Sequence, residues 1–309
     1  MDKMLISGGN GFLGSHLAER AIQKGFYVTV LDDFSTSNRV NVPDDVTIIR
    51  GKVEDIRLQN NFEYIVHLAA RPSPEDYISN PVETLMSNSV GTIKLLEMAK
   101  RGKSRFFYAS SSEVYGNAEV LPTPETYFGY VSSWGIRSCY DEGKRYSEAL
   151  TMAYHRKFGI DTRIQRSFNV YGPRIRPDGL YGRVIPRFIQ QALNGEDLTI
   201  HGNGMQTRSF LYVDDWVEAT WRMLTIDDLD GEILNIGSPD EINILELANF
   251  IVKMVHSSSK IVHVEKREED PVRRCADITK AMNILGWKPE TNLERGLHKT
   301  IEWVRRDFM

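Results

Sequence analysis

The chain has 309 residues, which predicts about two domains, and its 38 Lys and Arg against 42 Asp and Glu leave a net charge of −4. The hydrophobic fraction of 41% can fill a sizeable core, and the near balance of charge disfavours nucleic acid or an anionic membrane as a partner. Two cysteines form neither a disulfide framework nor a Cys-rich zinc site, and no apolar run is long enough to span a bilayer. We therefore expect a soluble, cytoplasmic protein without a metal site.

The first 115 residues alternate short β-rich runs with longer helical patterns, which is typical of βαβ units and a parallel sheet. Short apolar runs predict five buried strands, at residues 4–7, 27–32, 46–50, 64–68 and 105–110. Between them, apolar residues at helical spacing predict helices at 13–24 and 84–100, and each pattern stops near a glycine.

The second half of the chain begins with a predicted long helix at 140–157 and a sixth strand at 162–166. A stretch rich in Pro, Gly and Arg at 172–179 then indicates a loop. Afterwards helical patterns outnumber strands, at residues 185–193, 217–224, 245–256 and 293–305. We predict an α/β protein with a doubly wound parallel sheet in residues 1–171 and a smaller, mostly helical substrate domain in 172–213 and 238–309. The segment 214–237 is expected to return to the first domain.

A glycine-rich loop follows the first predicted strand and opens the first predicted helix. Gly8 allows a tight turn, Gly11 lets the backbone approach a pyrophosphate, and Gly14 permits close packing of the helix on the strand. An ordinary βα turn could carry the same glycines. However, Asp32 stands 18 residues after Gly14 (32 − 14), close to the ~20 expected for a carboxylate that binds the adenosine ribose. Together these features predict a dinucleotide site, and the carboxylate, which repels a 2′-phosphate, favours NAD over NADP.

Tyr140 and Lys144 are four residues apart, so they share one face of the predicted helix, although a surface pair would show the same spacing. The fifth predicted strand ends in the serine-rich stretch 109–112, and open α/β sheets bind ligands just outside the carboxyl ends of their strands. A nearby ammonium and a cationic nicotinamide favour the phenolate form of a tyrosine. Tyr140 is therefore a candidate base for a hydroxyl proton during hydride transfer.

These residues together resemble the extended short-chain dehydrogenase/reductase superfamily, specifically its NAD-dependent nucleotide-sugar epimerases and dehydratases. The resemblance rests on the glycine loop, on Ser111, and on the Tyr140-x-x-x-Lys144 pair. The stretches 110–116, 125–131 and 139–145 are most similar to UDP-glucuronate decarboxylases, also called UDP-xylose synthases. The resemblance runs nearly end to end, and it implies a Rossmann-type domain, NAD as cofactor, a UDP-sugar substrate and a homodimer.

The resemblance also implies roles for individual residues. It assigns catalysis to Ser111, Glu113, Tyr140, Lys144 and Arg183. It assigns cofactor binding to Gly8, Gly11, Phe12, Leu13, Gly14, Asp32 and Lys144. It assigns substrate binding to Ser112, Tyr127, Asn169, Val184, Arg208 and Arg274. Of these, Arg208 and Arg274 would clamp the diphosphate and Arg183 would face the sugar carboxylate, because guanidinium groups suit phosphate and carboxylate.

Among the departures from the family pattern, two positions bear on recognition of the bases. Lys52 follows Gly51 where relatives place an aspartate that contacts adenine, so this contact is expected from Asp55 or from the backbone. His201 stands where relatives often have a tyrosine, which leaves the identity of the base open.

The favoured reaction is the decarboxylation of UDP-glucuronate to UDP-xylose. Oxidation at C4 turns the sugar into a β-keto acid that loses CO2, and protonation at C5 with return of the hydride makes the reaction redox-neutral. Glu113 suits proton handling, and Arg183 can hold the departing carboxylate. A 4-epimerase acting on UDP-glucose or UDP-glucuronate is the first alternative, although it has no evident use for Glu113.

A 4,6-dehydratase is the second alternative. Many dehydratases have an aspartate at the position of Ser112, and a hydroxyl is a poor acid for expelling water. A protein that only binds NAD or partners is disfavoured, because Tyr140 and Lys144 are both present.

Overall fold

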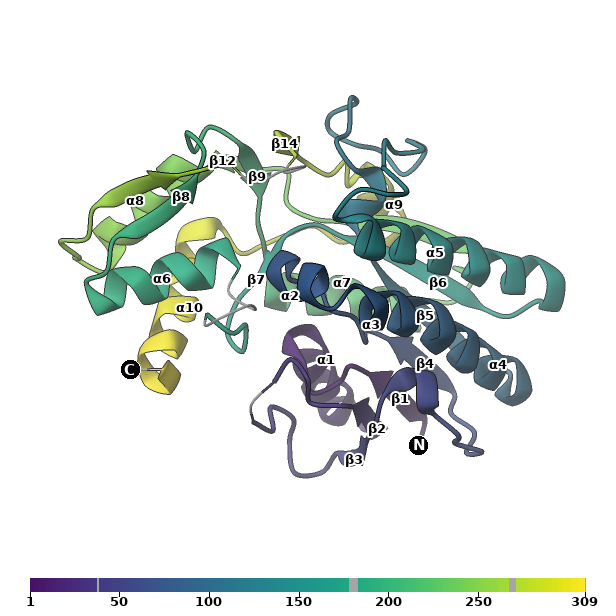
Figure 1. Cartoon of the computed structure of the whole chain (residues 1–309). Helices are drawn as coiled ribbons and strands as arrows, with labels where there is room; N and C mark the ends of the chain where they lie inside the picture. The colour runs from purple at the N-terminus through teal and green to yellow at the C-terminus, as the bar shows by residue number, and fades with distance from the viewer. Residues whose placement is uncertain (38, 178–182, 267–270, 309) are drawn as a thin grey trace.

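The computed structural model describes residues 1–37, 39–177, 183–266 and 271–308, and its centre is a seven-stranded sheet (Figure 1). The strand order is β11-β6-β5-β4-β1-β2-β3, and every neighbouring pair is parallel. The strands are β1 (Lys3–Ser7), β2 (Tyr27–Asp32), β3 (Thr47–Arg50), β4 (Tyr64–His67), β5 (Arg105–Ser111), β6 (Thr162–Ser167) and β11 (Glu232–Ile236). The six predicted strands are confirmed, each within one residue at its ends.

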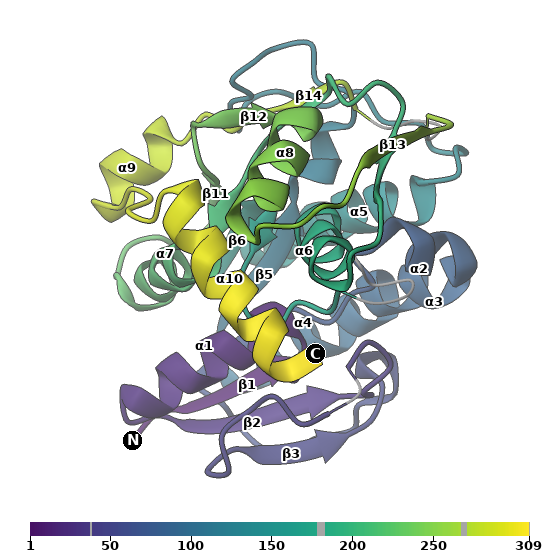
Figure 2. The ribbon, with the colours of Figure 1, turned by 90° about the vertical axis from the view of Figure 1, so that its left-hand side faces the viewer.

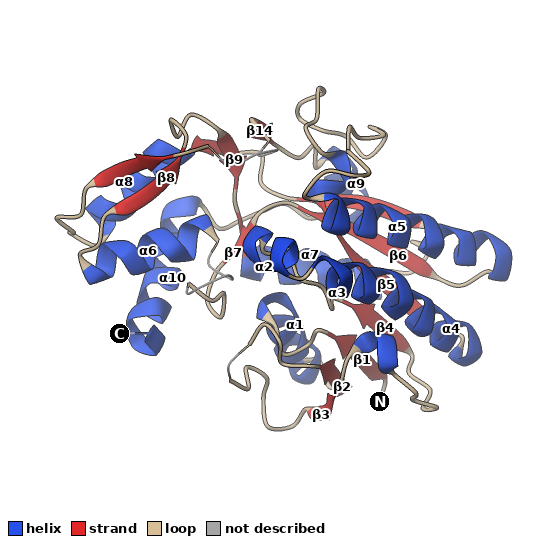
Figure 3. Cartoon of the chain, in the orientation of Figure 1, coloured by secondary structure: helices blue, strands red, loops and turns tan. Residues whose placement is uncertain are grey.

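Helices cover both faces of this sheet, as Figure 3 shows. Successive side chains of a strand point to opposite faces. Accordingly, Met4 and Ile6 join the apolar cluster that contains residues of α1 (Phe12–Gln23) and α7 (Val213–Thr225), whereas Leu5 joins the cluster with residues of α4 (Thr92–Gly102). Burial on both faces explains why these strands consist of nearly continuous apolar residues. The predicted doubly wound α/β fold is confirmed.

The helix predicted at 84–100 is interrupted in the structure. It consists of α3 (Pro81–Met86), a π-helical turn at Ser87–Gly91, and α4. The wide turn presents the carbonyl oxygen of Asn88, which accepts hydrogen bonds from the hydroxyls of Thr92 and of Ser147 on α5 (Ser138–Phe158). A regular helical spacing carries no sign of such an insertion, so the sequence predicted one continuous helix. A short helix, α2 (Pro74–Ser79), precedes it.

The remaining segments form a second layer of structure beyond the carboxyl ends of the large sheet (Figures 1 and 2). Its helices are α6 (Val184–Asn194), α8 (Ile244–Met254) and α10 (Leu293–Phe308), whereas α9 (Thr279–Leu285) packs against β11 and α7 at the edge of the large sheet. Its small sheets pair β7 (Val170–Tyr171) with β10 (Leu211–Tyr212), β8 (Leu198–His201) with β13 (Ile261–Val264), and β9 (Thr207–Ser209) with β12 (Glu241–Asn243) and β14 (Arg273–Arg274). The sequence did not predict these strands, because two to four residues show no alternation of apolar and polar positions.

Long-range contacts tie this second layer to the sheet. The segment 214–237 contributes β11, which pairs with β6 at the edge of the large sheet. The end of α10, yellow in Figure 2, lies close to the loop after β2, where Arg39 and Asp307 form an ion pair of 2.7 Å. Within the described ranges, none of the helices combines the length and the apolar composition that a membrane span requires.

Candidate active site

A cavity of ≈ 420 Å³ lies outside the carboxyl ends of the sheet strands. The chain leaves β1 toward β2 and β3 on one side, while β4, β5 and β6 lie on the other side, and ligands of open α/β sheets bind at such a switch point. The cavity is lined by the predicted cofactor residues, the predicted catalytic residues, and all but one of the predicted substrate residues. Tyr127 is the exception. The Tyr127 ring packs beside Tyr115, and its hydroxyl accepts a hydrogen bond from the backbone N–H of Glu119, so its role as a substrate residue stays a prediction.

The glycine loop forms one end of this cavity, and its sterics explain the sequence. Gly8 has a φ of +70°, and a Cβ there would lie 2.6 Å from the backbone nitrogen of Ala69. A Cβ on Gly14 would lie 2.3 Å from the carbonyl oxygen of Gly8. Any larger residue at Gly14 would therefore push α1 away from the loop. The helix begins at Phe12 without a side-chain cap, so its first backbone N–H groups are available to an anionic ligand.

Asp32 ends β2 beside this loop, with only 8% of its surface exposed. Its carboxylate accepts hydrogen bonds from the backbone N–H groups of Asn10 at 2.9 Å and of Phe34 at 2.8 Å. Burial raises the pKa of Asp32, and these two hydrogen bonds oppose the shift. A carboxylate has about four acceptor positions, so Asp32 retains capacity for a ligand hydroxyl.

Tyr140 and Lys144 lie on one face of α5, which confirms the i, i+4 geometry. Lys144 is 3% exposed, and its Nζ donates a hydrogen bond of 2.8 Å to the carbonyl oxygen of Ala109 on β5. Burial lowers the pKa of Lys144 to about 7, opposed by the negative charge of Glu148. The Lys144 ammonium is thus held near the end of β5, and its pKa lies close to neutral pH.

Tyr140 differs from the expectation of a stabilised phenolate. Burial raises the pKa of Tyr140 to about 12, although the charge of Arg183 and a hydrogen bond with Ser111 both lower it. The protein alone therefore keeps the phenol protonated. The ring of Tyr77, from α2, stacks on the Tyr140 ring at 5.1 Å and 11°. The sequence did not single out Tyr77, whose buried hydroxyl has no hydrogen-bond partner in the described part of the chain.

Glu113 follows β5 in a short 3-10 turn, Ser112–Tyr115, and its carboxylate lies between two arginines. Arg137 contacts Oε2 and Arg274 contacts Oε1. These two charges lower the pKa of Glu113 to about 2, against the opposing effect of its burial. Glu113 is therefore ionised at neutral pH. Arg137 was missed by the sequence analysis, because nothing in the local sequence links it to a carboxylate 24 positions earlier.

The predicted substrate residues gather at the other end of the cavity. Arg208 and Arg274 are register partners of the parallel strands β9 and β14, so the two arginines predicted to clamp a diphosphate are neighbours. Arg183 precedes α6 and Val184 begins it. Asn169 has a φ of +36°, and its side-chain amide donates to the carbonyl oxygen of Ser209 at 3.1 Å.

The sequence profile of the NAD-dependent epimerase/dehydratase family matches residues 4–237 of this chain. The chain belongs to the NAD-dependent epimerase/dehydratase family. A UDP-glucuronic acid decarboxylase of Xenopus tropicalis is 41% identical over 99% of this chain and 73% of its own length. A UDP-glucose 4-epimerase of Thermotoga maritima, solved with UDP-glucose, has a TM-score of 0.93 at 30% identity and covers 99% of this chain and 100% of its own. A UDP-glucuronic acid 4-epimerase of Bacillus cereus, solved with UDP-glucuronic acid and NAD, has a TM-score of 0.89 at 29% identity. The match covers 98% of this chain and 99% of the epimerase chain.

The residues of this chain fit the cofactor after which the epimerase/dehydratase family is named. Gly8 and Gly14 let the loop fold tightly, because a Cβ on either would lie within 2.6 or 2.3 Å of backbone atoms, and this loop leads into the uncapped start of α1, where a pyrophosphate would meet backbone N–H groups. Asp32 stands at the end of β2 with acceptor capacity for ribose hydroxyls. Lys144 and Tyr140 line the cavity next to the end of β5, where a nicotinamide would meet a substrate.

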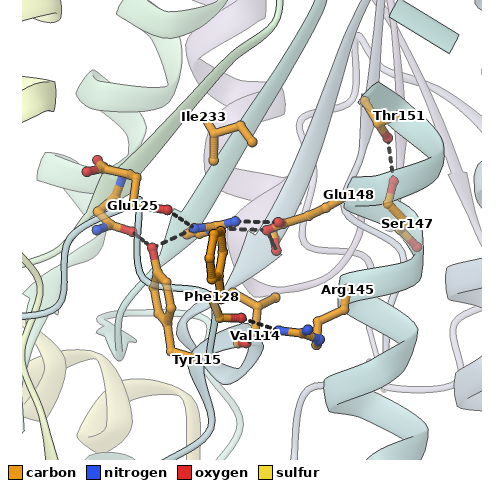
Figure 4. Close-up of polar contacts among 12 residues, drawn as sticks. Val114, Tyr115, Glu125, Phe128, Arg145, Ser147, Glu148, Thr151 and Ile233 are labelled. Carbon is orange, nitrogen blue, oxygen red and sulfur yellow. Dashed lines mark hydrogen bonds and ion pairs between the residues drawn. The ribbon is translucent and has the colours of Figure 1, made fainter. Parts of the chain in front are cut away.

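Figure 4 shows a second carboxylate–arginine group, which is centred on Glu148. Glu148, one turn after Lys144 on α5, accepts hydrogen bonds from Arg166 of β6 at 2.9 and 2.7 Å. Ser110 donates to the same carboxylate at 2.5 Å. Arg166 also donates to the hydroxyl of Tyr115 at 2.7 Å and to the carbonyl oxygen of Glu125 at 3.0 Å. This network joins α5, two sheet strands and the loop after Tyr115, and the sequence analysis did not identify it.

Proposed function

We propose that this protein decarboxylates UDP-glucuronate to UDP-xylose with NAD as its cofactor. The observation that carries the proposal is the charge around Tyr140. Glu113 lies there together with three arginines that line the cavity, Arg137, Arg183 and Arg274. A sugar carboxylate needs a cationic pocket next to the oxidised carbon, whereas a neutral hexose does not.

The residues act on the substrate in a defined order. Bound NAD supplies the acceptor and later the donor of a hydride, and its cationic ring adds the positive charge that favours ionised Tyr140. Tyr140 takes the proton of the C4 hydroxyl, with Ser111 as its hydrogen-bond partner. The resulting β-keto acid breaks its C5–C6 bond, CO2 leaves, and the electron pair is shared between C5 and the C4 oxygen.

The second half of the reaction returns the protons. C5 gains a proton from a water molecule, and the hydroxide that remains combines with the released CO2 to give bicarbonate. Ionised Glu113 can accept a hydrogen bond from this water. Tyr140 then returns its proton to the C4 oxygen as the hydride is restored. Arg183 holds the carboxylate that departs, so it acts in the first half only.

A 4-epimerase is the second candidate, supported by the solved epimerases that share this fold. Incubation with UDP-glucuronate, UDP-glucose and UDP-galactose, followed by mass analysis and proton NMR of the products, separates the two. Loss of CO2 from UDP-glucuronate supports decarboxylation. Conversion of UDP-glucuronate to UDP-galacturonate without a change of mass would replace it with epimerisation.

The assembly that we propose is a homodimer, acting in the cytoplasm. Large apolar side chains are exposed on neighbouring helices, Val82 at 65% and Leu85 at 42% on α3, and Tyr146 at 45% on α5. A second copy of this surface would bury them in a four-helix contact. Both cysteines are free and buried, which suits a reducing compartment. Light scattering at micromolar concentration measures the mass, and a Val82→Glu variant is expected to be monomeric.

A further inference from the structure

Arg137 lines the cavity, and the reaction steps proposed above give it no role of its own. It stands directly before α5, three positions before Tyr140, and only 12% of its side chain is exposed. Its guanidinium contacts Oε2 of Glu113, and its Nε lies 3.7 Å from Asp141. The same guanidinium lies 5.8 Å from the centre of the Tyr77 ring, the ring that stacks on Tyr140.

The two arginines on Glu113 come from different parts of the fold. Arg137 belongs to the sheet domain and is rigidly linked to Tyr140 through the first turn of α5. Arg274 belongs to β14 in the second layer, where it also donates to Ser112 at 3.1 Å and to the carbonyl oxygen of Gly116 at 3.3 Å. Its register partner Arg208 lies beside it. If a diphosphate draws Arg274 toward Arg208, Arg137 remains as the partner of Glu113.

We infer that Arg137 is a positioning residue of this reaction, which holds the Glu113 carboxylate at a fixed place beside Tyr140 while the substrate is turned over. The inference rests on the proposed function, because it assigns the residue to that same site. A bidentate-capable, permanently charged group suits this task better than a lysine. A displacement of a reacting group by about 1 Å costs roughly 10²-fold in rate.

The charge of Glu113 should depend on Arg137. The titratable and charged groups that face Glu113 come from α5 and the residue before it, from α2, from β14 and from the residue before α6. They are Arg137, Tyr140, Asp141, Tyr77, Arg274 and Arg183. Arg137 is the first of the charges that lower the pKa of Glu113, and burial raises it. Removing Arg137 leaves the burial and removes part of the compensation, so the pKa of Glu113 rises.

The first test follows Glu113 itself, without any reaction. Protein with 13C-labelled glutamate carboxyls is titrated from pH 4 to pH 9 by NMR, and the Glu113 signal is assigned by its loss in Glu113→Gln. In the wild type the signal should not titrate, because Glu113 is ionised throughout. In Arg137→Gln it should titrate inside this range. A signal that stays unchanged in Arg137→Gln overturns the inference whether or not UDP-glucuronate is the substrate.

The second test is a double-mutant cycle on kcat. Arg137→Gln should lower kcat roughly 10²-fold with KM nearly unchanged, and Arg137→Lys should recover part of the loss. In the Glu113→Gln background the same change should cost less than about threefold, because neighbours that act as one unit are not additive. Equal losses in both backgrounds would show that Arg137 acts independently of Glu113 and would overturn the inference. So would an effect on KM alone, which would make Arg137 a direct ligand of the substrate.

Arg145→Gln is the matched control. Arg145 lies on the same helix, and it donates to the backbone carbonyls of Val114 and Phe128 without reaching Glu113 or the cavity. The Arg145→Gln variant should leave the titration of the Glu113 NMR signal unchanged and kcat within about threefold of the wild type. If the wild type releases no CO2 from UDP-glucuronate, the proposed function fails, while the NMR titration still decides the role of Arg137.

Discussion

Two carboxylates near the end of β5 are each held by arginine, yet their surroundings differ. Glu113 lines the cavity, its side chain is 20% exposed, and its partners Arg137 and Arg274 come from different layers of the fold. Glu148 does not line the cavity, its side chain is 10% exposed, and its partner Arg166 lies on a strand of the central sheet. The first group faces the place of a ligand, and the second is enclosed by the protein.

This difference assigns different roles to the two carboxylates, with Glu113 available to a reacting ligand and Glu148 stabilising the fold. A ligand can exchange with a partner of Glu113, because Arg274 also belongs to the predicted substrate residues and borders the cavity. The Glu148 carboxylate accepts hydrogen bonds from Arg166 and Ser110 on both oxygens and does not line the cavity, so a ligand in the cavity does not reach it. We expect changes at Glu113 to alter the rate and changes at Glu148 to alter the stability.

The largest expected effect is on the rate of Glu113→Gln. A group that handles protons contributes about 10²–10⁴-fold, so kcat for CO2 release should fall by that order. The stability should fall as well, because Arg137 and Arg274, whose side chains are 12% and 5% exposed, lose their carboxylate, so kcat is measured per folded enzyme. Single-turnover mass analysis of the UDP-sugar, together with a thermal melt, measures both. A variant with normal kcat would make Glu113 a structural carboxylate like Glu148.

Glu148→Gln should instead destabilise the fold. Removing one partner of a buried ion pair costs about 3–5 kcal/mol, because the remaining charge is left without compensation. Urea unfolding should show this loss, while kcat of the folded fraction should fall less than about tenfold. Replacing both partners, Glu148→Leu with Arg166→Met, should restore much of the stability.

Asp161→Asn provides the control for that comparison. Asp161 precedes the other end of β6 and forms ion pairs with Arg105 at 2.5 Å and Arg163 at 3.0 Å, outside the cavity. The Asp161→Asn variant should be less stable than the wild type, and its kcat should be unchanged. A large loss of kcat in Glu148→Gln, absent from Asp161→Asn, would mean that Glu148 also tunes Lys144.

Lys144→Met tests the electrostatic cost of the site as a function of pH. Burial lowers the pKa of Lys144 from 10.5 to about 7, so the unfolded chain binds the proton more tightly than the folded one. The folded state therefore bears the full penalty below pH 7, and the penalty disappears as pH rises from 7 to 10.5. The variant should be inactive, yet its Tm should exceed that of the wild type by roughly 5 °C at pH 6 and by much less at pH 10. Calorimetry at both pH values checks the sign, and a constant difference would contradict it.

The sequence predicted what is local and missed what is long-range. The glycine loop, Asp32 and the Tyr140–Lys144 pair were found because each has a fixed spacing that follows from strand–turn–helix geometry. The sheet was found because its strands are short apolar runs. Arg137 and Glu148 were missed because their partners are 24 and 18 positions away, and no periodicity connects them.

Carrying a role over from a family motif had mixed results. It brought Arg183, Arg208 and Arg274 to one cavity, although they lie far apart in the sequence. It did not bring Tyr127 to the cavity lining, although Tyr127 lies in a matching stretch; the ring packs against Tyr115 instead. Whether a residue in a loop reaches a cavity depends on the path of the whole loop, and a motif does not fix that path.

The smallest effects are expected from removing two adjacent hydroxyls, those of Ser110 next to Glu148 and of Ser111 next to Glu113. Ser110 donates to Glu148 at 2.5 Å, whereas Ser111 hydrogen-bonds with Tyr140 and accepts from the backbone N–H of Glu113 at 3.3 Å. Ser110→Ala removes one hydrogen bond to a charged group that keeps Arg166, so it should cost about 1–2 kcal/mol of stability and change kcat less than about threefold. Ser111→Ala, one residue further, should lower kcat with little change in Tm. Urea unfolding and steady-state kinetics on this pair separate the two roles within a single peptide unit, and the opposite result would mean that the enclosed carboxylate, not the one in the cavity, controls Tyr140.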